Sequence, residues 1–211
     1  MKRGIISIII CALSFWALPA RAELVTIQIT GEVDFVGDPY LYFEGKIKTG
    51  DLITGTYTYD LSTPDLYPLS LQSGVYEHFA PPCGVSLTVS CLEFQTDPTS
   101  VNFSIGIVND YPPVDNYGFI SYNNLPLSNG VTVDLIVWEL EDPSGKAISS
   151  DTLPTTAPIL DDWQLNRLGI YGPPRGNSFG IVAHVTSAVL IPEPATMLLL
   201  GLGLLLLRKR T

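Results

Sequence analysis

Cys83 and Cys91 are the side chains of this sequence most suited to covalent chemistry. In an oxidising compartment such a pair can form a disulfide. If the residues between them are extended, eight steps of about 3.3 Å separate the two Cα atoms by roughly 26 Å, whereas a disulfide needs about 4.4–6.8 Å. The bond therefore requires the chain to fold back, and Val85–Val89 carries no turn signal. A Cys83–Cys91 disulfide and two free thiols both stay open.

His78 and His184 are the only histidines, and both lie in strand-like runs. A metal site needs two or three such ligands that converge, so we expect two solvent-facing histidines and no metal. The sequence contains no Gly-x-Ser-x-Gly nucleophile elbow and no local cysteine–histidine signature. We therefore expect no catalytic residues and no enzymatic activity.

Carboxylates offer a different chemistry, because oxygen-rich loops suit calcium. None of these loops has the spacing of a dedicated calcium loop, so the expected cofactor is none, with calcium as an alternative. A hydrolase of matrix polysaccharide with two distant carboxylates is a less favoured alternative. The oxygen-rich segments are Asp60–Asp65, Asn109–Asp110 with Asp115–Asn116, Glu139–Asp142 and Asp161–Asp162.

Aromatic side chains are the fourth group, because they can stack against sugar rings. Tyr111, Tyr117 and Tyr122 flank a Pro-Pro loop that could form the rim of such a site, with Trp138 and Trp163 elsewhere in the chain. Aromatic residues in strands are more often core or cross-strand partners. Carbohydrate binding is therefore an alternative function.

The charges are distributed unevenly along the 211 residues. The chain has 21 acidic and 11 basic residues, a formal charge of -10. Six of the basic residues lie at the two ends, so Glu23–Glu193 holds five basic residues against all 21 acidic ones, a formal charge of -16. Such a body repels nucleic acid phosphates and anionic lipid. We expect no nucleic acid partner.

The elements that must position these residues are strands. Apolar and polar residues alternate with period two, and Gly, Pro, Asn and Asp separate the runs. This pattern predicts an all-β fold, a single antiparallel β-sandwich (jelly-roll-like or Ig-like) over residues 23–190. The only plausible helix turn is Leu160–Leu168. The expected strands are Leu24–Phe35, Ile53–Tyr59, Gly74–Phe79, Val85–Val89, Leu92–Thr96, Val101–Val108, Tyr117–Tyr122, Val131–Leu140 and Phe179–Leu190.

The first 22 residues have the composition of an export signal. Lys2 and Arg3 precede the apolar run Ile5–Leu18, and the small residues Ala20 and Ala22 follow. A basic front, a run of this length and small residues at the -3 and -1 positions are typical of a secretory signal peptide. We expect cleavage before Glu23, after export by the Sec machinery.

The last segment, residues 191–211, combines three features. Pro192, Glu193 and Pro194 precede an apolar run of 13 residues, Ala195–Leu207, which the basic cluster Arg208, Lys209 and Arg210 ends. As a helix the run would be roughly 20 Å long, short of the ~30 Å hydrocarbon core. The basic cluster would stop on the cytoplasmic side. This pattern predicts a marginal transmembrane helix and transient membrane anchoring.

The order and spacing of these features resemble the PEP-CTERM sorting signal of Gram-negative, exopolysaccharide-producing bacteria. The resemblance covers Pro192 to Arg210 and the signal peptide at the other end. It implies recognition by an exosortase, a membrane-embedded cysteine transpeptidase, and cleavage near Pro192–Pro194. The product would pass through an inner-membrane intermediate to the outer surface or the extracellular matrix. Such proteins accompany biofilm and exopolysaccharide, which is the partner that the resemblance suggests.

Overall fold

The structure is a computed structural model that describes residues 23–111, 113–173 and 178–192. The predicted signal peptide, with Ala20 and Ala22, lies outside the described residues. The same holds for Glu193, Pro194, the predicted transmembrane run and the basic cluster Arg208–Arg210. The elements are β1 Leu24–Gly37, β2 Leu52–Asp60, β3 Ser73–His78, β4 Gly84–Val89, β5 Leu92–Gln95, β6 Phe103–Val108, β7 Asp115–Ser121, β8 Leu135–Asp142, the 3₁₀ turn η1 Leu160–Asp162, β9 Leu165–Tyr171 and β10 Gly180–Ile191.

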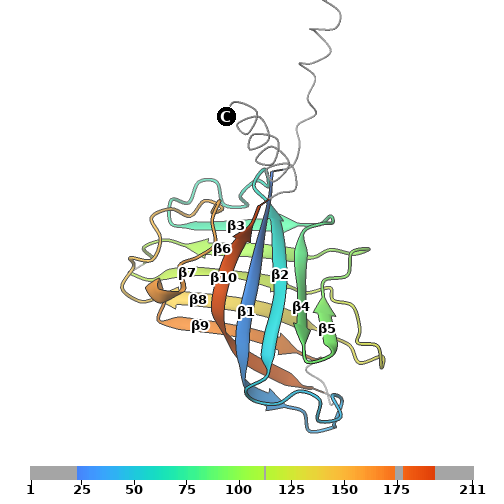
Figure 1. The fold of residues 1–211 in the computed structure, drawn as a ribbon. Helices are drawn as coiled ribbons and strands as arrows, with labels where there is room; N and C mark the ends of the chain where they lie inside the picture. Colours follow the sequence, from blue (N-terminus) through green and yellow to red (C-terminus); the bar gives the residue numbers. More distant parts are fainter. Residues whose placement is uncertain (1–22, 112, 174–177, 193–211) are drawn as a thin grey trace, which may run out of the picture.

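The ten strands form one antiparallel sheet in the order β3-β6-β7-β8-β9-β10-β1-β2-β4-β5. Figure 1 shows this sheet folded over itself, with β3, β6, β7, β8 and β9 in one layer and β1, β2, β4 and β5 crossing in front of them. The predicted all-β antiparallel class is confirmed. The two layers of the sandwich are halves of one continuous sheet, joined through β10, where jelly-roll and Ig folds have two sheets.

The fold in the sheet occurs where β10 passes from one layer to the other. β10 pairs with β9 through only four residues, Gly180–Ala183, but pairs with β1 along its whole length. The β1–β10 register shifts at two points, where Thr186 of β10 and Asp34 of β1 are left without a partner. Such bulges bend a strand and increase its twist. Gly31 allows the close approach, because a Cβ there would lie 2.5 Å from the His184 carbonyl oxygen.

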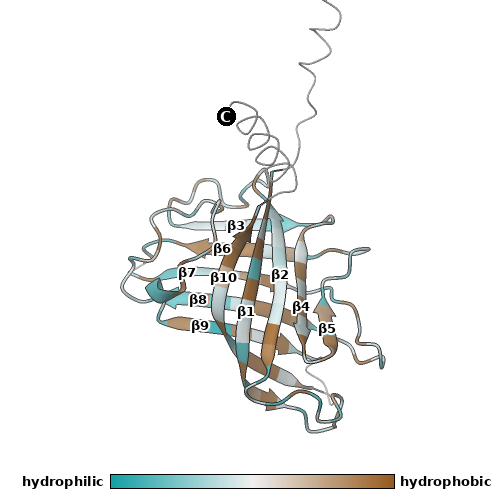
Figure 2. Cartoon of the chain, in the orientation of Figure 1, coloured by the Kyte–Doolittle hydropathy of each residue, from teal (hydrophilic) through white to brown (hydrophobic). Residues whose placement is uncertain are grey.

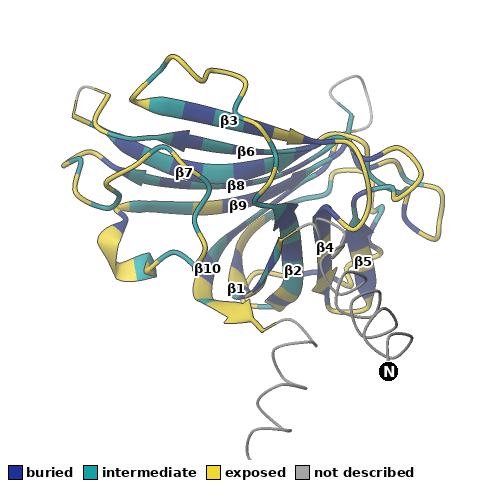
Figure 3. Ribbon diagram, turned by 90° about the horizontal axis from the view of Figure 1, so that it is seen from above, coloured by how far each residue is buried: buried dark blue, intermediate teal, exposed yellow. Residues whose placement is uncertain are grey.

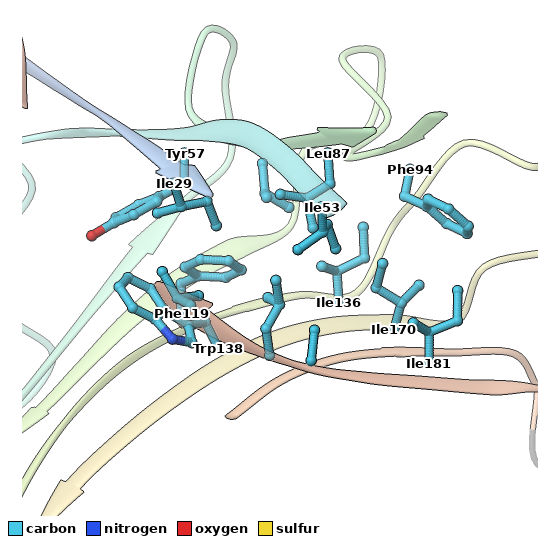
Figure 4. Packing of buried hydrophobic residues seen from close by; sticks show 14 of the residues in the cluster. Ile29, Ile53, Tyr57, Leu87, Phe94, Phe119, Ile136, Trp138, Ile170 and Ile181 are labelled. Carbon is cyan, nitrogen blue, oxygen red and sulfur yellow. The ribbon is translucent and has the colours of Figure 1, made fainter. Parts of the chain in front are cut away.

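The core lies between the two layers and is rich in aromatic residues. Along each strand buried apolar residues alternate with more polar ones, as Figure 2 shows by their hydropathy. In the close view of Figure 4, Ile29, Ile53 and Tyr57 from one layer point toward residues of the other layer. The rings of Tyr57 and Trp138 meet edge-on with centroids 5.8 Å apart, a geometry that adds stabilisation beyond buried area.

The prediction of a helix turn at Leu160–Leu168 is wrong beyond its first residues. The 3₁₀ turn ends at Asp162, and β9 begins at Leu165 between β8 and β10. Leu168 and Ile170 are buried on the inner face of the sheet. The backbone N–H and C=O groups of β8 and β10 need hydrogen-bond partners, which an extended β9 supplies to both strands. This requirement decides the local structure, because the helical periodicity of the segment is weak. The predicted strand Val131–Leu140 likewise begins only at Leu135.

Candidate functional site

The C-terminal end of β10 leads directly into the predicted sorting motif. The last pair of the β1–β10 ladder is Thr26 with Ile191, and the next residue is the exposed Pro192. A proline has no N–H to donate, so it ends pairing in a natural way. Pro192 is the only residue of the predicted motif that the structure describes. It directly follows Ile191, the last residue of the sheet.

The N-terminal end of the described chain lies at the same end of this ladder. β1 begins at Leu24, and the backbone carbonyl of Glu23 accepts a hydrogen bond from the Leu61 N–H at 2.9 Å. In Figure 1 the start of β1 and the arrowhead of β10 meet at the top of the molecule. The expected signal peptidase site, just before Glu23, and the expected sorting motif therefore border the same edge of the domain.

The last residues of β10 are exposed and have a strand partner on one side only. The pairing of β10 with β9 ends at Ala183, while the pairing with β1 continues to Ile191. Val189 is 56% exposed and Ile191 38% exposed. Figure 3 colours this terminal part of β10 as exposed. The strand thus presents an extended, accessible segment immediately before Pro192.

One side chain on β9, that of Asn166, replaces the backbone hydrogen bonds of β9 at the point where β10 leaves that strand. The Asn166 amide nitrogen donates to the Val185 carbonyl at 2.7 Å, and its amide oxygen accepts from the Val185 N–H at 3.2 Å. The Trp138 indole N–H donates to the same oxygen at 3.0 Å. Asn166 therefore takes the place of a paired strand residue, a role that no sequence pattern indicated.

The two histidines have different environments. His78 is buried on β3, its Nε2 accepts a hydrogen bond from the Asp60 N–H at 3.2 Å, and its Nδ1 has no partner among the described residues. Burial lowers the pKa of its imidazole below the ordinary value, and this effect outweighs nearby backbone hydrogen bonds that raise the pKa. His184 is half-exposed on β10 and its Nδ1 lies 2.8 Å from Asp34 Oδ1. The expectation that both histidines face solvent is wrong for His78, because it points into the core beside Phe103.

Cys83 and Cys91, the two cysteines among the described residues, flank β4 and are both free thiols. Cys83 is buried and Cys91 is exposed. The extended strand between them explains why the structure does not bring them together. Burial raises the pKa of the Cys83 thiol to about 11, so it stays protonated and unreactive at neutral pH.

Several carboxylates of the oxygen-rich loops accept hydrogen bonds from backbone N–H groups, namely those of Asp60, Asp65, Asp115 and Asp142. Asp115 and Asp142 lie opposite each other on β7 and β8, and both are buried. Asp115 accepts from the Asp110 and Ile148 N–H groups at 2.9 and 3.0 Å. Backbone N–H groups, that of Lys146 first, also hold the pKa of Asp142 below its usual range. No three histidine, cysteine, aspartate or glutamate side chains gather as a metal would require in the described part of the chain.

The aromatic residues considered for sugar stacking are divided between core and surface. Tyr117 and Trp138 are buried, and the Tyr117 hydroxyl lies 2.9 Å from that of Tyr57. Tyr111 and Tyr122 are exposed, so the expected rim loses its middle member. Trp163 is 9% exposed and packs near Tyr117. The aromatic residues chiefly build the core.

Comparisons with known proteins bear on the C-terminal end alone. Residues 190–210 match the model of the PEP-CTERM protein-sorting motif. No curated protein and no solved structure matches the chain significantly. Within the described residues no helix is both long and apolar enough to span a bilayer. The match at residues 190–210 shows that the chain carries a PEP-CTERM signal. This signal marks an exported protein that exosortase processes at the membrane on the way to the cell surface.

Proposed function

We propose that this chain is a non-catalytic surface or matrix protein whose β domain is the cargo of its own sorting signal. The observation that carries the proposal is the end of β10. The last strand, β10, ends at Ile191, and Pro192 follows without an intervening linker. Cleavage near Pro192–Pro194 would leave every strand of the domain intact, because the paired residues stop before the motif.

Each part of the two ends has a role in this proposal. Ala20 and Ala22 direct signal peptidase, and the apolar run with Arg208–Arg210 holds the inner-membrane intermediate. Pro192, Glu193 and Pro194 form the element that exosortase recognises and cuts. The product then reaches the outer surface or the extracellular matrix, where exopolysaccharide is its partner.

The absence of enzymatic activity is part of the same proposal. The buried ionisable groups that could act as acid, base or nucleophile serve the fold: His78 and Cys83 are buried, and Asp115 accepts two backbone N–H bonds. A catalytic acid or base needs access to substrate and a pKa near the operating pH. The protonated Cys83 thiol does not meet these conditions.

The experiment is a double substitution, Pro192→Ala with Pro194→Ala, in a host that contains exosortase. We expect the uncut precursor to accumulate in the membrane fraction, because the motif is altered while the paired part of β10 is kept. Pro154→Ala, which changes a proline in a loop of the domain, is the matched control and should leave processing unchanged. Normal size and location of the double variant would contradict the sorting role of the motif.

A further inference from the structure

The outer face of the layer formed by β10, β1, β2 and β4 contains a group of eight hydroxyl residues. The inward residues of these strands are apolar and buried, so period-two alternation places the threonine and serine residues outward. We call this group the hydroxyl face. Its members are Thr26, Thr30, Thr54, Thr56, Thr58, Ser86, Thr88 and Ser187.

The strand register aligns these hydroxyls in rows. Thr30 lies opposite Ser187 on β10 and opposite Thr54 on β2, and Thr54 lies opposite Thr88 on β4. Four hydroxyl-bearing residues thus cross four adjacent strands, spaced by about 4.8 Å from strand to strand. A parallel row begins about 7 Å away, two residues along β2 at Thr56.

The second row adds amide groups to the hydroxyls. Thr56 lies between Gln28 on β1 and Ser86 on β4, and Ser86 lies opposite Gln95 on β5. Hydroxyl and amide groups both donate and accept hydrogen bonds. The face therefore repeats one kind of neutral polar group over a broad surface.

Two hollows give this face relief. One, of about 170 Å³, is lined in part by the hydroxyl residues Thr56, Thr58 and Ser86 and by three prolines, Pro81, Pro82 and Pro98. The other, of about 380 Å³, lies toward the opposite end of β2 and β4 and is lined by Asp51, Leu52, Thr54, Thr88 and Ser90. In the first hollow, hydroxyl groups beside proline rings suit a ligand with hydroxyl groups on its rim and C–H groups on its faces.

The charges decide which ligand fits. The eight hydroxyl residues are uncharged, and the carboxylates that border them on the same face include Glu32 on β1 and Glu93, which lies opposite Thr88. Glu23–Glu193 as a whole carries a formal charge of -16. Anionic polymers and nucleic acids are repelled by such a body.

Protein partners bind through buried aromatic, Met and Arg residues. Besides hydroxyl residues, the second row contains Gln28 and Gln95, with Val189 opposite Gln28, and none of those anchor residue types.

We propose that the hydroxyl face binds an uncharged, hydroxyl-rich polysaccharide, with the rows and the two hollows along β2 and β4 as its track. This inference rests on the proposed function, which names exopolysaccharide as the partner, and it deepens that function by assigning the binding face and the uncharged class of polysaccharide. It differs from the aromatic platform expected from Tyr111, Tyr117 and Tyr122. The binding groups here are hydroxyls, amides and proline rings on the other layer of the sheet.

The test is retention of the full chain, in a detergent without a sugar headgroup, on immobilised dextran, amylose and cellulose. Alginate and polygalacturonate serve as anionic probes. The variant Thr54→Val, Thr56→Val, Thr88→Val removes three hydroxyls and keeps β-branched side chains that suit a strand. The matched control, Ser104→Val with Asn116→Val, removes polar groups from the outer face of the other layer.

We expect retention on at least one neutral glucan and none on the anionic polymers. The triple variant should bind at least about tenfold more weakly, because each neutral hydrogen bond contributes about a two- to tenfold factor. The control should stay within about twofold, since exposed substitutions away from a site have small effects.

Three results would overturn the inference: no retention of the wild type on any neutral glucan, full retention of the triple variant, or equal retention on anionic polymers. All of them are measured on purified protein without exosortase. Failure of the sorting proposal would instead appear as normal processing of the proline variant in cells. The two outcomes are therefore distinguishable.

Discussion

The two halves of β10 have the same secondary structure and opposite surroundings. Gly180–Val185 includes the residues paired on both sides, with β9 and with β1, and its inward residues belong to the core. Beyond Val185 the strand keeps β1 alone as its partner, and Val189, Leu190 and Ile191 are exposed. The difference teaches that β10 itself contributes buried residues to the core mainly through its first half, while opposite its second half β1 continues to supply core residues such as Ile27. The remainder of β10 connects that core to the sorting motif.

The largest expected effect comes from one truncation in each half. Ile181 is 1% exposed and Val189 is 56% exposed. Ile181→Ala should reduce the free energy of unfolding by about 2–5 kcal/mol, because it removes buried methyl groups and leaves a cavity. Val189→Ala should change it by less than about 0.5 kcal/mol. Urea unfolding of both variants measures the contrast, and equal losses would show that the two halves contribute alike.

The next effect concerns Asn166, which marks the boundary between the halves. Asn166→Asp keeps acceptors for the Val185 and Trp138 N–H groups but leaves the Val185 carbonyl without its donor. We expect a loss of about 1–3 kcal/mol in unfolding free energy, the cost of an unsatisfied buried polar group. Asn116→Asp, which adds the same charge on the outer face of β7, is the control and should cost far less. Indistinguishable urea midpoints for the two variants would exclude the proposed role of Asn166.

The smallest effect is the acid sensitivity that His78 adds. Because burial lowers the pKa of folded His78, the unfolded chain binds the proton first, at about pH 6.5. Stability should therefore fall as the pH drops below about 6.5 and stop falling on this account below the folded pKa. The contribution cannot exceed about 1.4 kcal/mol per pH unit.

The comparison of His78→Gln with wild type isolates this contribution. Glutamine offers an oxygen to the Asp60 N–H but does not titrate. The stability of His78→Gln measured between pH 7 and 5 should decline less steeply than that of wild type. His184→Gln, at the half-exposed site beside Asp34, is the matched control. A wild-type slope in His78→Gln would refute the assignment.

Local patterns predicted the strands well, because each strand has one buried and one outer face. Leu24–Phe35 and Phe179–Leu190 differ from β1 and β10 by two residues or fewer at either end. β9 was missed, because Leu165 and Leu168 also fit a helical period and only the neighbouring strands decide between the two. The continuity of the sheet through β10 depends on one bulge in β10 and one in β1, which residue alternation does not reveal.

The candidate sites divide in the same way. The sorting motif lies in consecutive residues, so the sequence alone revealed it, and the family model matches it. The burial of His78 could not be predicted, because the inward face of the edge strand β3 is decided by its pairing with β6. The rows of the hydroxyl face join residues from four strands, such as Ser187 and Thr88. Only the register brings these residues together.

The most direct test of the central claim is the intact mass of the protein recovered from outside a producing cell. We predict a chain that begins at Glu23 and ends within Pro192–Pro194, so that β1 to β10 are retained and Arg208–Arg210 are lost. A protein recovered with its C-terminal basic cluster still attached would contradict the account. Cleavage before Ile191, within the paired part of β10, would contradict it equally.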